Sequence, residues 1–393
     1  MTLVIKSLSA KLDASKHRLV LITPRPEYVN LIGSLRLVTD PSTSYDDVFM
    51  PYTKVFGNFP GKIIVGSATS IEETKIEIAR IRSRSAGDLL GPGQGVGSAN
   101  VSVAGGDVIL DTGERVPYDV IILATGSIWE GIVAFPNKPG EYVEHVESWR
   151  RKIRAAQKIV IVGGGPVGIE TAGEIKDTYP SKEVTIVQGD RLLLNDVYPD
   201  KFRVSVQRKL ESQGVEIILD DAVKGNPHCL SRPIKTREGR ELTCDLLNAD
   251  GYMCHQITAR GGGANTNYLK FLKPTPLTDR GYVKVLSTLE VLYHPGMFAL
   301  GDIVDLPEVK QLAKISLGHA DVVVKNVLQY LNGEMTTHSY RGSTDYMAIC
   351  VGKGGGVSFL GLWWGFVFGD FFTRYMKSRT LLVEQVRDTL GLS

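Results

Sequence analysis

Residues 159–170 read Ile-Val-Ile-Val-Gly-Gly-Gly-Pro-Val-Gly-Ile-Glu, and this stretch decides the fold. A β-branched strand runs into the pattern G-x-G-x-x-G, after which residues 169–176 are predicted to form a helix. Gly163 permits the tight turn, Gly165 lets a pyrophosphate approach the backbone, and Gly168 lets the helix pack closely on the strand. The helix N-terminus then offers unpaired N–H groups to the phosphates. The stretch therefore predicts a dinucleotide site rather than a glycine-rich turn without a ligand.

A second strand, predicted over residues 183–187, supplies the expected contact with the adenosine ribose. It ends at Gln188, 20 residues after Gly168, where dinucleotide-binding folds contact the ribose. A carboxylate at this position would repel a 2′-phosphate, and a nearby arginine would bind it. Gln188, with Arg191 three residues further on, leaves both NADH and NADPH open.

The regions around this motif also read as alternating strands and helices. The predicted elements are a helix over residues 3–12, strands over 18–22 and 62–65, a buried strand over 117–126 that ends in Ala-Thr-Gly, a strand over 296–302 that ends in Gly-Asp, and a helix over about 309–331. Two dinucleotide-binding domains, the second inserted into the first, would explain this order.

The composition indicates a globular enzyme of two or three domains. Of the 393 residues 43% are hydrophobic and 22% are charged. The net charge of +2 is too small to indicate binding to nucleic acid. The four cysteines include no C-x-x-C pair, which argues against a redox disulfide and against a zinc site. We therefore expect no metal and interpret these residues as structural thiols: Cys229, Cys244, Cys254 and Cys350.

The ordered set of motifs resembles the flavoproteins with two dinucleotide-binding domains, the pyridine nucleotide–disulfide reductase superfamily. Within it, the chain most resembles the apoptosis-inducing-factor-like branch, which includes the ferroptosis-suppressor-type quinone reductases. The residues that carry the resemblance are 22–28 with 35–36, 123–127, 163–174, 300–302 and 352–357. The resemblance implies bound FAD, NAD(P)H as the hydride donor and a quinone-like electron acceptor.

The resemblance also implies roles for individual residues. The residues expected to bind FAD are Arg36, Ala68, Ala124, Thr125, Gly126, Gly301 and Asp302. Among them, Asp302 would accept a hydrogen bond from a hydroxyl of the ribityl chain, and Arg36 would approach the flavin unless it is a solvated basic residue. On the nicotinamide side, Glu170 would orient the carboxamide, although a carboxylate in a first helical turn also favours the helix dipole by itself.

The N-terminus departs from the family pattern. Family members begin with a strand and a first G-x-G-x-x-G that hold the FAD pyrophosphate, and this sequence opens with the helix that should follow them. Thr23, at the end of the next predicted strand, replaces the acidic residue often found at the ribose contact. We expect the missing segment upstream of Met1; a short natural form that binds FAD poorly is the alternative.

The predicted fold class is α/β, with two Rossmann-like dinucleotide-binding domains of the glutathione-reductase type and a small C-terminal domain. The FAD domain comprises residues 1–136 and 270–335, and the NAD(P) domain inserted into it comprises residues 137–269. The C-terminal domain comprises residues 336–393. The sequence Pro-Asn-Lys-Pro-Gly over residues 136–140 provides the first linker.

Residues 354–369 carry no charge and five aromatic side chains, and Arg374, Lys377 and Arg379 follow. With six glycines in sixteen residues, the run is too short to span a bilayer, which takes ~20 apolar residues. It predicts either an interfacial patch on anionic lipid or a buried interface of the C-terminal domain. The first alternative implies a cytoplasmic enzyme with peripheral contact through residues 354–379, at a lipid droplet, mitochondrial or plasma membrane.

The sequence thus predicts an FAD-dependent oxidoreductase that passes hydride from NAD(P)H to flavin and electrons on to a quinone-like acceptor. A truncated, noncatalytic relative that serves as a binding or redox-signalling protein is the alternative. Bound flavin absorbs visible light, so the colour of the purified protein would distinguish an empty fold from a flavoprotein.

Overall fold

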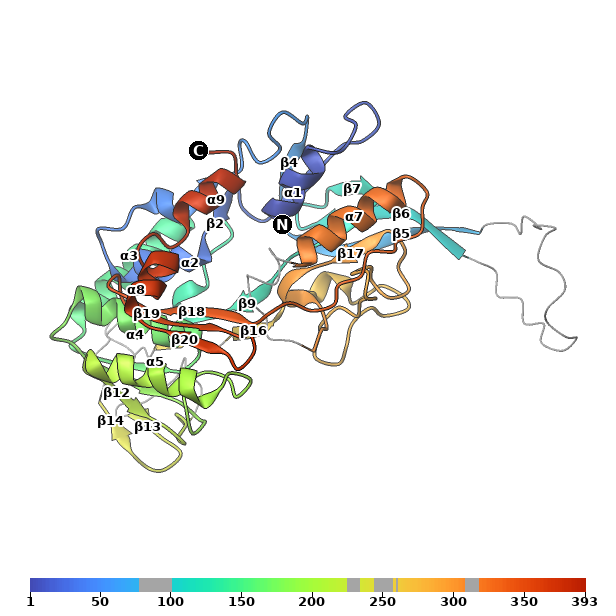
Figure 1. Cartoon of the computed structure of the whole chain (residues 1–393). Coiled ribbons are helices and arrows are strands. Elements are labelled where there is room, and N and C mark those ends of the chain that lie inside the picture. The colour runs from blue at the N-terminus through green and yellow to red at the C-terminus, as the bar shows by residue number, and fades with distance from the viewer. Residues whose placement is uncertain (78–100, 225–233, 244–256, 259–260, 308–317) are drawn as a thin grey trace, which may run out of the picture.

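The computed structural model describes residues 1–77, 101–224, 234–243, 257–258, 261–307 and 318–393. Figure 1 shows two lobes: residues 141–218, in green, lie in one, and residues 297–331, in orange, lie in the other. The red C-terminal residues, from 346 onward, lie on the first lobe and return towards the N-terminus.

The first lobe is built on a parallel sheet of order β12-β11-β10-β15. Its elements are α3 (Glu141–Ala155), β10 (Lys158–Val162), α4 (Pro166–Thr178), β11 (Glu183–Val187), α5 (Asp200–Ser212), β12 (Val215–Ile218) and β15 (Ile257–Thr258), beside a hairpin of β13 (Ile234–Lys235) and β14 (Glu241–Leu242). Residues 159–162 of β10 are buried, as their β-branched sequence predicts for a strand covered on both faces. Helix α4 begins three residues earlier than predicted because Pro166, with its fixed φ, suits the first helical position.

The second lobe holds two separate pairs of parallel strands. Its elements are α1 (Thr2–Ser9), β1 (Val20–Thr23), β4 (Lys62–Val65), β8 (Ile121–Leu123), β17 (Met297–Ala299) and α7 (Ala320–Leu331). β1 pairs with β4 and β8 pairs with β17, and within the described residues no strand joins one pair to the other. Val4 and Leu8 of α1 share a core with Phe298 of β17. Because Ile5 shares another core with Leu21 of β1, α1 bridges the two pairs.

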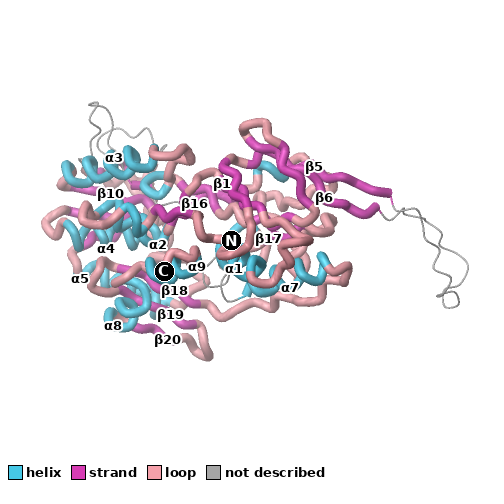
Figure 2. The backbone as a smooth tube through the Cα atoms, turned by 90° about the horizontal axis from the view of Figure 1, so that it is seen from above, coloured by secondary structure: helices cyan, strands magenta, loops and turns pink. Residues whose placement is uncertain are grey.

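The single strand predicted over residues 117–126 is wrong, because the structure has two strands there. The antiparallel sheet of this lobe consists of β5 (Ala68–Glu77), β6 (Val101–Leu110) and β7 (Arg115–Tyr118). Tyr118 pairs with Gly106 in this sheet, whereas Ile121 pairs with Met297 in the parallel pair. One straight strand cannot serve both sheets, so the chain bends at residues 119–120. Figure 2 shows β5 and β6 extending away from the lobe.

An antiparallel ribbon connects the two lobes. β9 (Ser127–Trp129) follows β8 closely and pairs with β16 (Gly261–Ala264), which returns from the first lobe. Two features precede this ribbon in the sequence: helix α2 (Leu31–Thr39) and the hairpin of β2 (Glu27–Val29) and β3 (Phe49–Pro51). Leu37 of α2 and Phe49 of β3 share the core of the first lobe. Residues 27–51, which fall in the predicted FAD domain, therefore also contact the predicted NAD(P) domain.

The C-terminal residues form an antiparallel sheet of order β18-β19-β20, followed by short helices. The elements are β18 (Tyr346–Cys350), β19 (Gly356–Leu360), β20 (Phe366–Phe368), α8 (Asp370–Thr373), the π-helix Arg374–Ser378 and α9 (Val383–Thr389). β19 packs on α5, and α9 reaches α1, where Lys6 forms an ion pair with Asp388. No helix in the described ranges is both long enough and apolar enough to cross a membrane.

Candidate functional site

The glycine loop between β10 and α4 leaves open space at the start of the helix. Gly163 has a φ of +112°, which a residue with a side chain rarely adopts, and it donates its N–H to the carbonyl of Val187 at 2.9 Å. Gly165 is the N-cap of α4, and a Cβ added there would meet no atom within 4 Å. Gly168 is buried in the first turn. The loop therefore fits a pyrophosphate, which would lie beside Gly165 and the first N–H groups of α4.

Side-chain hydrogen bonds hold the end of β11 next to this loop. Gln188 accepts a hydrogen bond through Oε1 from the N–H of Gly164 at 2.8 Å, and its Nε2 donates to Asp190 at 2.8 Å. Arg191 forms an exposed ion pair with Asp200, the first residue of α5, at 2.7 Å. The structure thus places Gln188 and Arg191 near the loop, but a 2′-phosphate would compete with Asp200 for Arg191. The sequence analysis did not single out Asp190 or Asp200.

Glu170 was expected in the first turn of the helix, but α4 begins at Pro166, so Glu170 lies just beyond the first turn, where it contacts the C-terminal sheet. Its Oε1 accepts hydrogen bonds from the backbone N–H of Cys350 at 2.9 Å and from Nζ of Lys377 at 2.6 Å. Among the described residues Oε2 has no hydrogen-bond partner, and the side chain of Glu170 is 12% exposed. One carboxylate oxygen is therefore fixed, and the other is available to a ligand that approaches the start of α4.

Lys377 is a site residue for which the sequence left two alternatives, lipid contact or a buried interface. The lipid-facing alternative is wrong for this residue, because Nζ of Lys377 points inward to Glu170 and to the carbonyl of Ala348 at 2.9 Å. Burial by itself would lower the pKa of Lys377, but the Glu170 carboxylate outweighs burial and the pKa is raised. Burial raises the pKa of the neighbouring Cys350 thiol to about 12, in agreement with a structural thiol. The other cysteines lie outside the described residues: Cys229, Cys244 and Cys254.

Arg36 lies on α2 and binds the same helix, α4. Its Nε and Nη2 donate to the two carboxylate oxygens of Glu174 at 2.9 and 2.7 Å, and both side chains are buried. Burial raises the pKa of Glu174, and the Arg36 guanidinium opposes that rise. The alternative of a solvated arginine is therefore wrong. The contacts of Arg36 hold α2 against α4.

The carboxyl ends of β8 and β17 bring two of the predicted FAD-binding segments together. Ser127, which follows the Ala124-Thr125-Gly126 turn, donates its hydroxyl to Oδ2 of Asp302 at 3.0 Å. Gly126 and Gly301 turn the chain at these strand ends with φ values of +68° and +82°. Ligands of open α/β sheets bind outside the carboxyl ends of parallel strands, so this cluster lies where a cofactor is expected.

Asn265, Tyr268 and His319 fix the two turns, and the sequence analysis singled out neither Tyr268 nor His319. Thr125 donates its hydroxyl to the carbonyl of Asn265 and lies 3.1 Å from the hydroxyl of Tyr268. The N–H of Gly301 donates to Nδ1 of His319 at 3.1 Å. His319 precedes α7, the described part of the helix predicted over 309–331, whose first residues lie outside the described ranges. Asp302 itself caps no helix but lies in a 3-10 turn.

The described residues fit the flavin and ribityl part of FAD better than its pyrophosphate. Oδ1 of Asp302 has no partner among them, so it can accept a hydrogen bond from a cofactor hydroxyl. Thr23 instead turns its hydroxyl to the carbonyl of Arg25. Ala68, at the start of β5, packs against the core of the lobe. Within the described ranges, no glycine loop leads into a helix between the two strand pairs, so they provide no phosphate site there.

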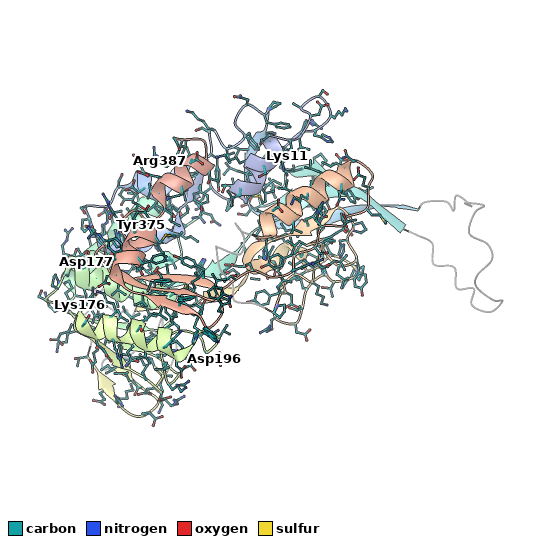
Figure 3. The ribbon with its side chains drawn as sticks, in the orientation of Figure 1. Lys11, Lys176, Asp177, Asp196, Tyr375 and Arg387 are labelled. Carbon is teal, nitrogen blue, oxygen red and sulfur yellow. The ribbon has the colours of Figure 1, made fainter. Side chains whose placement is uncertain are left out.

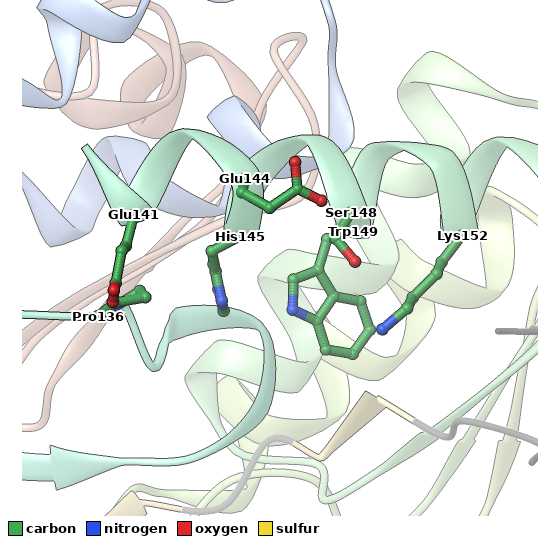
Figure 4. A pocket seen from close by; sticks show the side chains of 7 residues that line it. All are labelled: Pro136, Glu141, Glu144, His145, Ser148, Trp149 and Lys152. Atoms are coloured by element: carbon green, nitrogen blue, oxygen red, sulfur yellow. The ribbon is translucent and has the colours of Figure 1, made fainter. Parts of the chain in front are cut away.

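A surface hollow of about 390 Å³ lies elsewhere, along one face of α3 (Figure 4). In it the ammonium of Lys152 lies 4.9 Å from the centre of the Trp149 ring, and His145 is held by the carbonyl of Ile132 at 3.0 Å. None of these side chains contacts the glycine loop or Glu170, so the hollow is not part of the candidate site.

The aromatic C-terminal run divides between its two predicted alternatives. Phe359 and Val367 pack in or against the core of the first lobe, as the buried-interface alternative predicts. Trp363 and Trp364 are exposed, so that alternative is wrong for them.

The first lobe has a complete nucleotide loop and the second has converging strand-end turns, which together are typical of a protein with two dinucleotide-binding domains. The family model described as pyridine nucleotide-disulphide oxidoreductase matches residues 52–320. The chain belongs to this family.

Three relatives support the same assignment. FAD-dependent oxidoreductase FVFD30 of Flammulina velutipes is 36% identical, over 91% of this chain and 99% of that protein. Apoptosis-inducing factor homolog A of Dictyostelium discoideum is 23% identical, over 96% and 87% of the two chains. Ferroptosis suppressor protein 1 of Mus musculus is 28% identical, over 73% and 75%.

A solved structure shows the same fold. An engineered water-forming NADPH oxidase bound to NADPH superposes with a TM-score of 0.60 at 16% identity, over 92% of this chain and 73% of that one. The comparisons confirm the predicted α/β fold with two dinucleotide-binding domains, the apoptosis-inducing-factor-like resemblance, and FAD and NAD(P)H as the cofactors.

Proposed function

We propose that this protein is a quinone-reductase-type enzyme that takes hydride from NAD(P)H and delivers electrons to a quinone-like acceptor. The acceptor class rests on the resemblance to the ferroptosis-suppressor-type enzymes, and the relative in Mus musculus supports that resemblance. The domain limits and site residues predicted from the sequence are part of the same proposal.

The observation that carries the proposal is the state of Glu170. Its Oε1 is fixed by Cys350 and Lys377, which leaves Oε2 to accept a hydrogen bond at the start of the nucleotide helix. A nicotinamide carboxamide has N–H donors that suit this acceptor. Because one oxygen of this carboxylate is fixed and the other can accept a hydrogen bond, the carboxylate can orient a ligand. A noncatalytic relative would not need to orient a ligand in this way.

The remaining residues would bind and position the two cofactors. When bound, FAD accepts hydride from the nicotinamide and passes electrons to the acceptor. The pyrophosphate of the nicotinamide nucleotide would lie beside Gly165, and Asp302, held by Ser127, would accept from a ribityl hydroxyl. Lys377 donates a hydrogen bond to Oε1 of Glu170, which fixes the orientation of the carboxylate.

The proposal includes a nucleotide preference and a location. Asp190 lies at the end of β11 and Arg191 is occupied by Asp200, which favours NADH over NADPH. The enzyme would be cytoplasmic and would contact a membrane peripherally through residues 354–379, because a quinone-like acceptor dissolves in lipid.

A stopped-flow experiment with flavin-loaded protein tests the proposal. Under anaerobic conditions NADH should bleach the flavin absorbance, and a water-soluble benzoquinone should restore it within one turnover. Glu170→Gln should slow the bleaching while leaving the reoxidation rate unchanged, because Glu170 is assigned to the nicotinamide. Bleaching that no quinone reverses would exclude a quinone-like acceptor. Absence of bleaching would exclude hydride transfer from NADH to the flavin.

A further inference from the structure

The surface of the C-terminal domain carries a cluster of aromatic side chains that the nucleotide and flavin sites do not use. Trp363, Trp364, Phe371 and Tyr375 are 88%, 92%, 90% and 80% exposed. Other large apolar residues are exposed elsewhere on the chain, but these four follow one another within 13 positions. Four aromatic residues left in water at one place are costly, and such patches mark interaction sites.

Ring contacts make the cluster continuous from the β19–β20 turn to α8. Trp363 meets Phe366 edge-on with ring centres 6.3 Å apart, and Phe366 stacks on Phe368 at 6.3 Å. Phe368 stacks in turn on Phe372 at 4.4 Å. Phe371 precedes Phe372 in α8, and Figure 3 shows Tyr375 on the segment that follows α8. We call Trp363, Trp364, Phe366, Phe371 and Tyr375 the aromatic patch.

The fold holds the tip of this patch in a fixed conformation. Trp363 has a φ of +51°, which is costly for a bulky side chain, and Gly365 closes the turn with a φ of +73°. Lys201 of α5 donates hydrogen bonds to the carbonyls of Trp364 and Gly365. The two tryptophans are therefore held outward from the first lobe.

The charges around the patch are positive. Between residues 361 and 381 the sequence has Asp370, Arg374, Lys377 and Arg379. Asp370 is neutralised by Lys209 at 2.7 Å, and Lys377 is bonded to Glu170. Arg374 and Arg379 form no ion pair among the described residues, but Arg379 lines a pocket with Asp47 and Lys353. Of the two, Arg374 therefore supplies the positive charge assigned to the patch.

We propose that the aromatic patch docks the protein on an anionic lipid surface. Tryptophan and tyrosine prefer the headgroup region, where the ring is in an apolar layer and the polar atom is in water. Arg374 complements the anionic headgroups. The proposal deepens the peripheral contact stated under the proposed function, and vesicle binding tests it without reference to the electron acceptor.

A further consequence concerns orientation. The same short segment exposes Phe371 and Tyr375 and sends Lys377 inward to Glu170, because the π-helix Arg374–Ser378 follows α8 without a break. The exposed rings and the Lys377 ammonium therefore have different surroundings, so docking by the patch does not require the contact with Glu170 to break.

Sedimentation with lipid vesicles tests the proposal. The flavin-loaded full chain should bind vesicles of phosphatidylcholine with phosphatidylserine, bind pure phosphatidylcholine vesicles much less, and dissociate as salt rises. Trp363→Ser with Trp364→Ser and, separately, Phe371→Ser with Tyr375→Ser should each weaken binding by about tenfold or more. Arg374→Gln should weaken binding and reduce the salt dependence. Phe271→Ser, an exposed aromatic residue outside the patch, is the matched control and should bind as the unmodified chain does.

Measurements of the solution mass and the turnover of each variant distinguish lipid docking from unfolding and from self-association. All variants should keep their unfolding temperature and their turnover with a water-soluble quinone, because the altered side chains are exposed. Equal binding to both kinds of vesicle, or no loss in either double variant, would overturn the proposal. A dimer in solution that both double variants dissociate, with no vesicle binding, would assign the patch to a second copy of the chain and would also overturn it.

Discussion

The nucleotide lobe and the flavin lobe differ at the centre of their sheets. In the nucleotide lobe β10 lies between β11 and β15 and runs directly into the glycine loop. In the flavin lobe β1–β4 and β8–β17 stay separate pairs within the described residues, and α1 packs across them. Both lobes place polar turns at the carboxyl ends of their strands, but only the first also presents a helix N-terminus beside an uncrowded glycine among the described residues.

This difference separates two requirements of a dinucleotide site. The phosphate contact needs the central strand, because that strand aims the glycine loop and the helix N-terminus at one point. The contacts at the far end of the cofactor come from other strands, as Ser127 and Asp302 show. A lobe can therefore keep its redox-end residues in place while its phosphate contact depends on a separate segment.

The largest expected effect concerns the flavin lobe. Fusing a β-branched strand that ends in G-x-G-x-x-G in front of Met1 should raise the affinity of the 393-residue chain for FAD by roughly 1000-fold, about 4 kcal/mol. The reason is that the added loop supplies the phosphate contact and joins the two strand pairs. Flavin fluorescence titration measures it. Stoichiometric FAD in the unextended chain would show that the lobe binds its phosphates in another way.

The next effect concerns the nucleotide lobe. Gly165→Val should raise the Michaelis constant for NADH by roughly 100-fold, about 2.7 kcal/mol, because the side chain fills the space for the pyrophosphate. FAD content should not change. Gly354→Val is the control, since Gly354 also has no atom within 4 Å of an added Cβ and no positive φ. Loss of flavin with NADH binding retained would reverse the assignment of the two lobes.

A smaller effect is expected where the C-terminal domain holds the nucleotide helix. Lys377→Met should destabilise the protein by about 3 kcal/mol in denaturant unfolding, because it leaves Glu170 buried without its counter-charge. Lys209→Met, which breaks the more exposed pair with Asp370, should cost no more than about 1 kcal/mol. Equal losses in the two variants would contradict a special role for Lys377.

The pH dependence of that loss follows from the raised pKa of Lys377. A lysine whose folded pKa is raised contributes stability that is fully present below its unfolded pKa, about 10.4, and is lost as pH rises through the folded pKa. The stability difference between the unmodified protein and Lys377→Met should therefore stay constant between pH 7 and about pH 10. A difference that shrinks near neutral pH would show that another group controls the pair.

The smallest expected effect concerns the choice of nucleotide. Asp200→Asn removes the partner of Arg191, so Arg191 becomes available to a 2′-phosphate. The Michaelis constant for NADPH should fall several-fold, and the constant for NADH should stay the same. Asp196→Asn, an exposed neighbour outside this pair, is the control. If neither Michaelis constant changes, Arg191 does not recognise the 2′-phosphate.

The nucleotide half of the site follows from sequence because its signals are local. Residues 159–170 contain the strand, the turn and the helix start in one run, in which Gly163 supplies a positive φ and Gly165 leaves open space. The strand end at Gln188 lies at a fixed distance along the same unit. Such units form the same geometry wherever they occur, so spacing alone predicted the loop, the helix and the fold class.

Contacts between distant segments could be decided only by the tertiary structure. Lys377 reaches Glu170 across 207 positions and Arg36 reaches Glu174 across 138, and no spacing rule links either pair. The apolar residues of the aromatic run divide between the core and the surface, because successive residues of a strand face opposite sides. Val367 packs inward, while the preceding residue, Phe366, is exposed. Sequence thus determined which residue types could bind a dinucleotide. Packing determined which charges are buried together and which aromatic side chains remain outside, because burial depends on what the rest of the chain places against them.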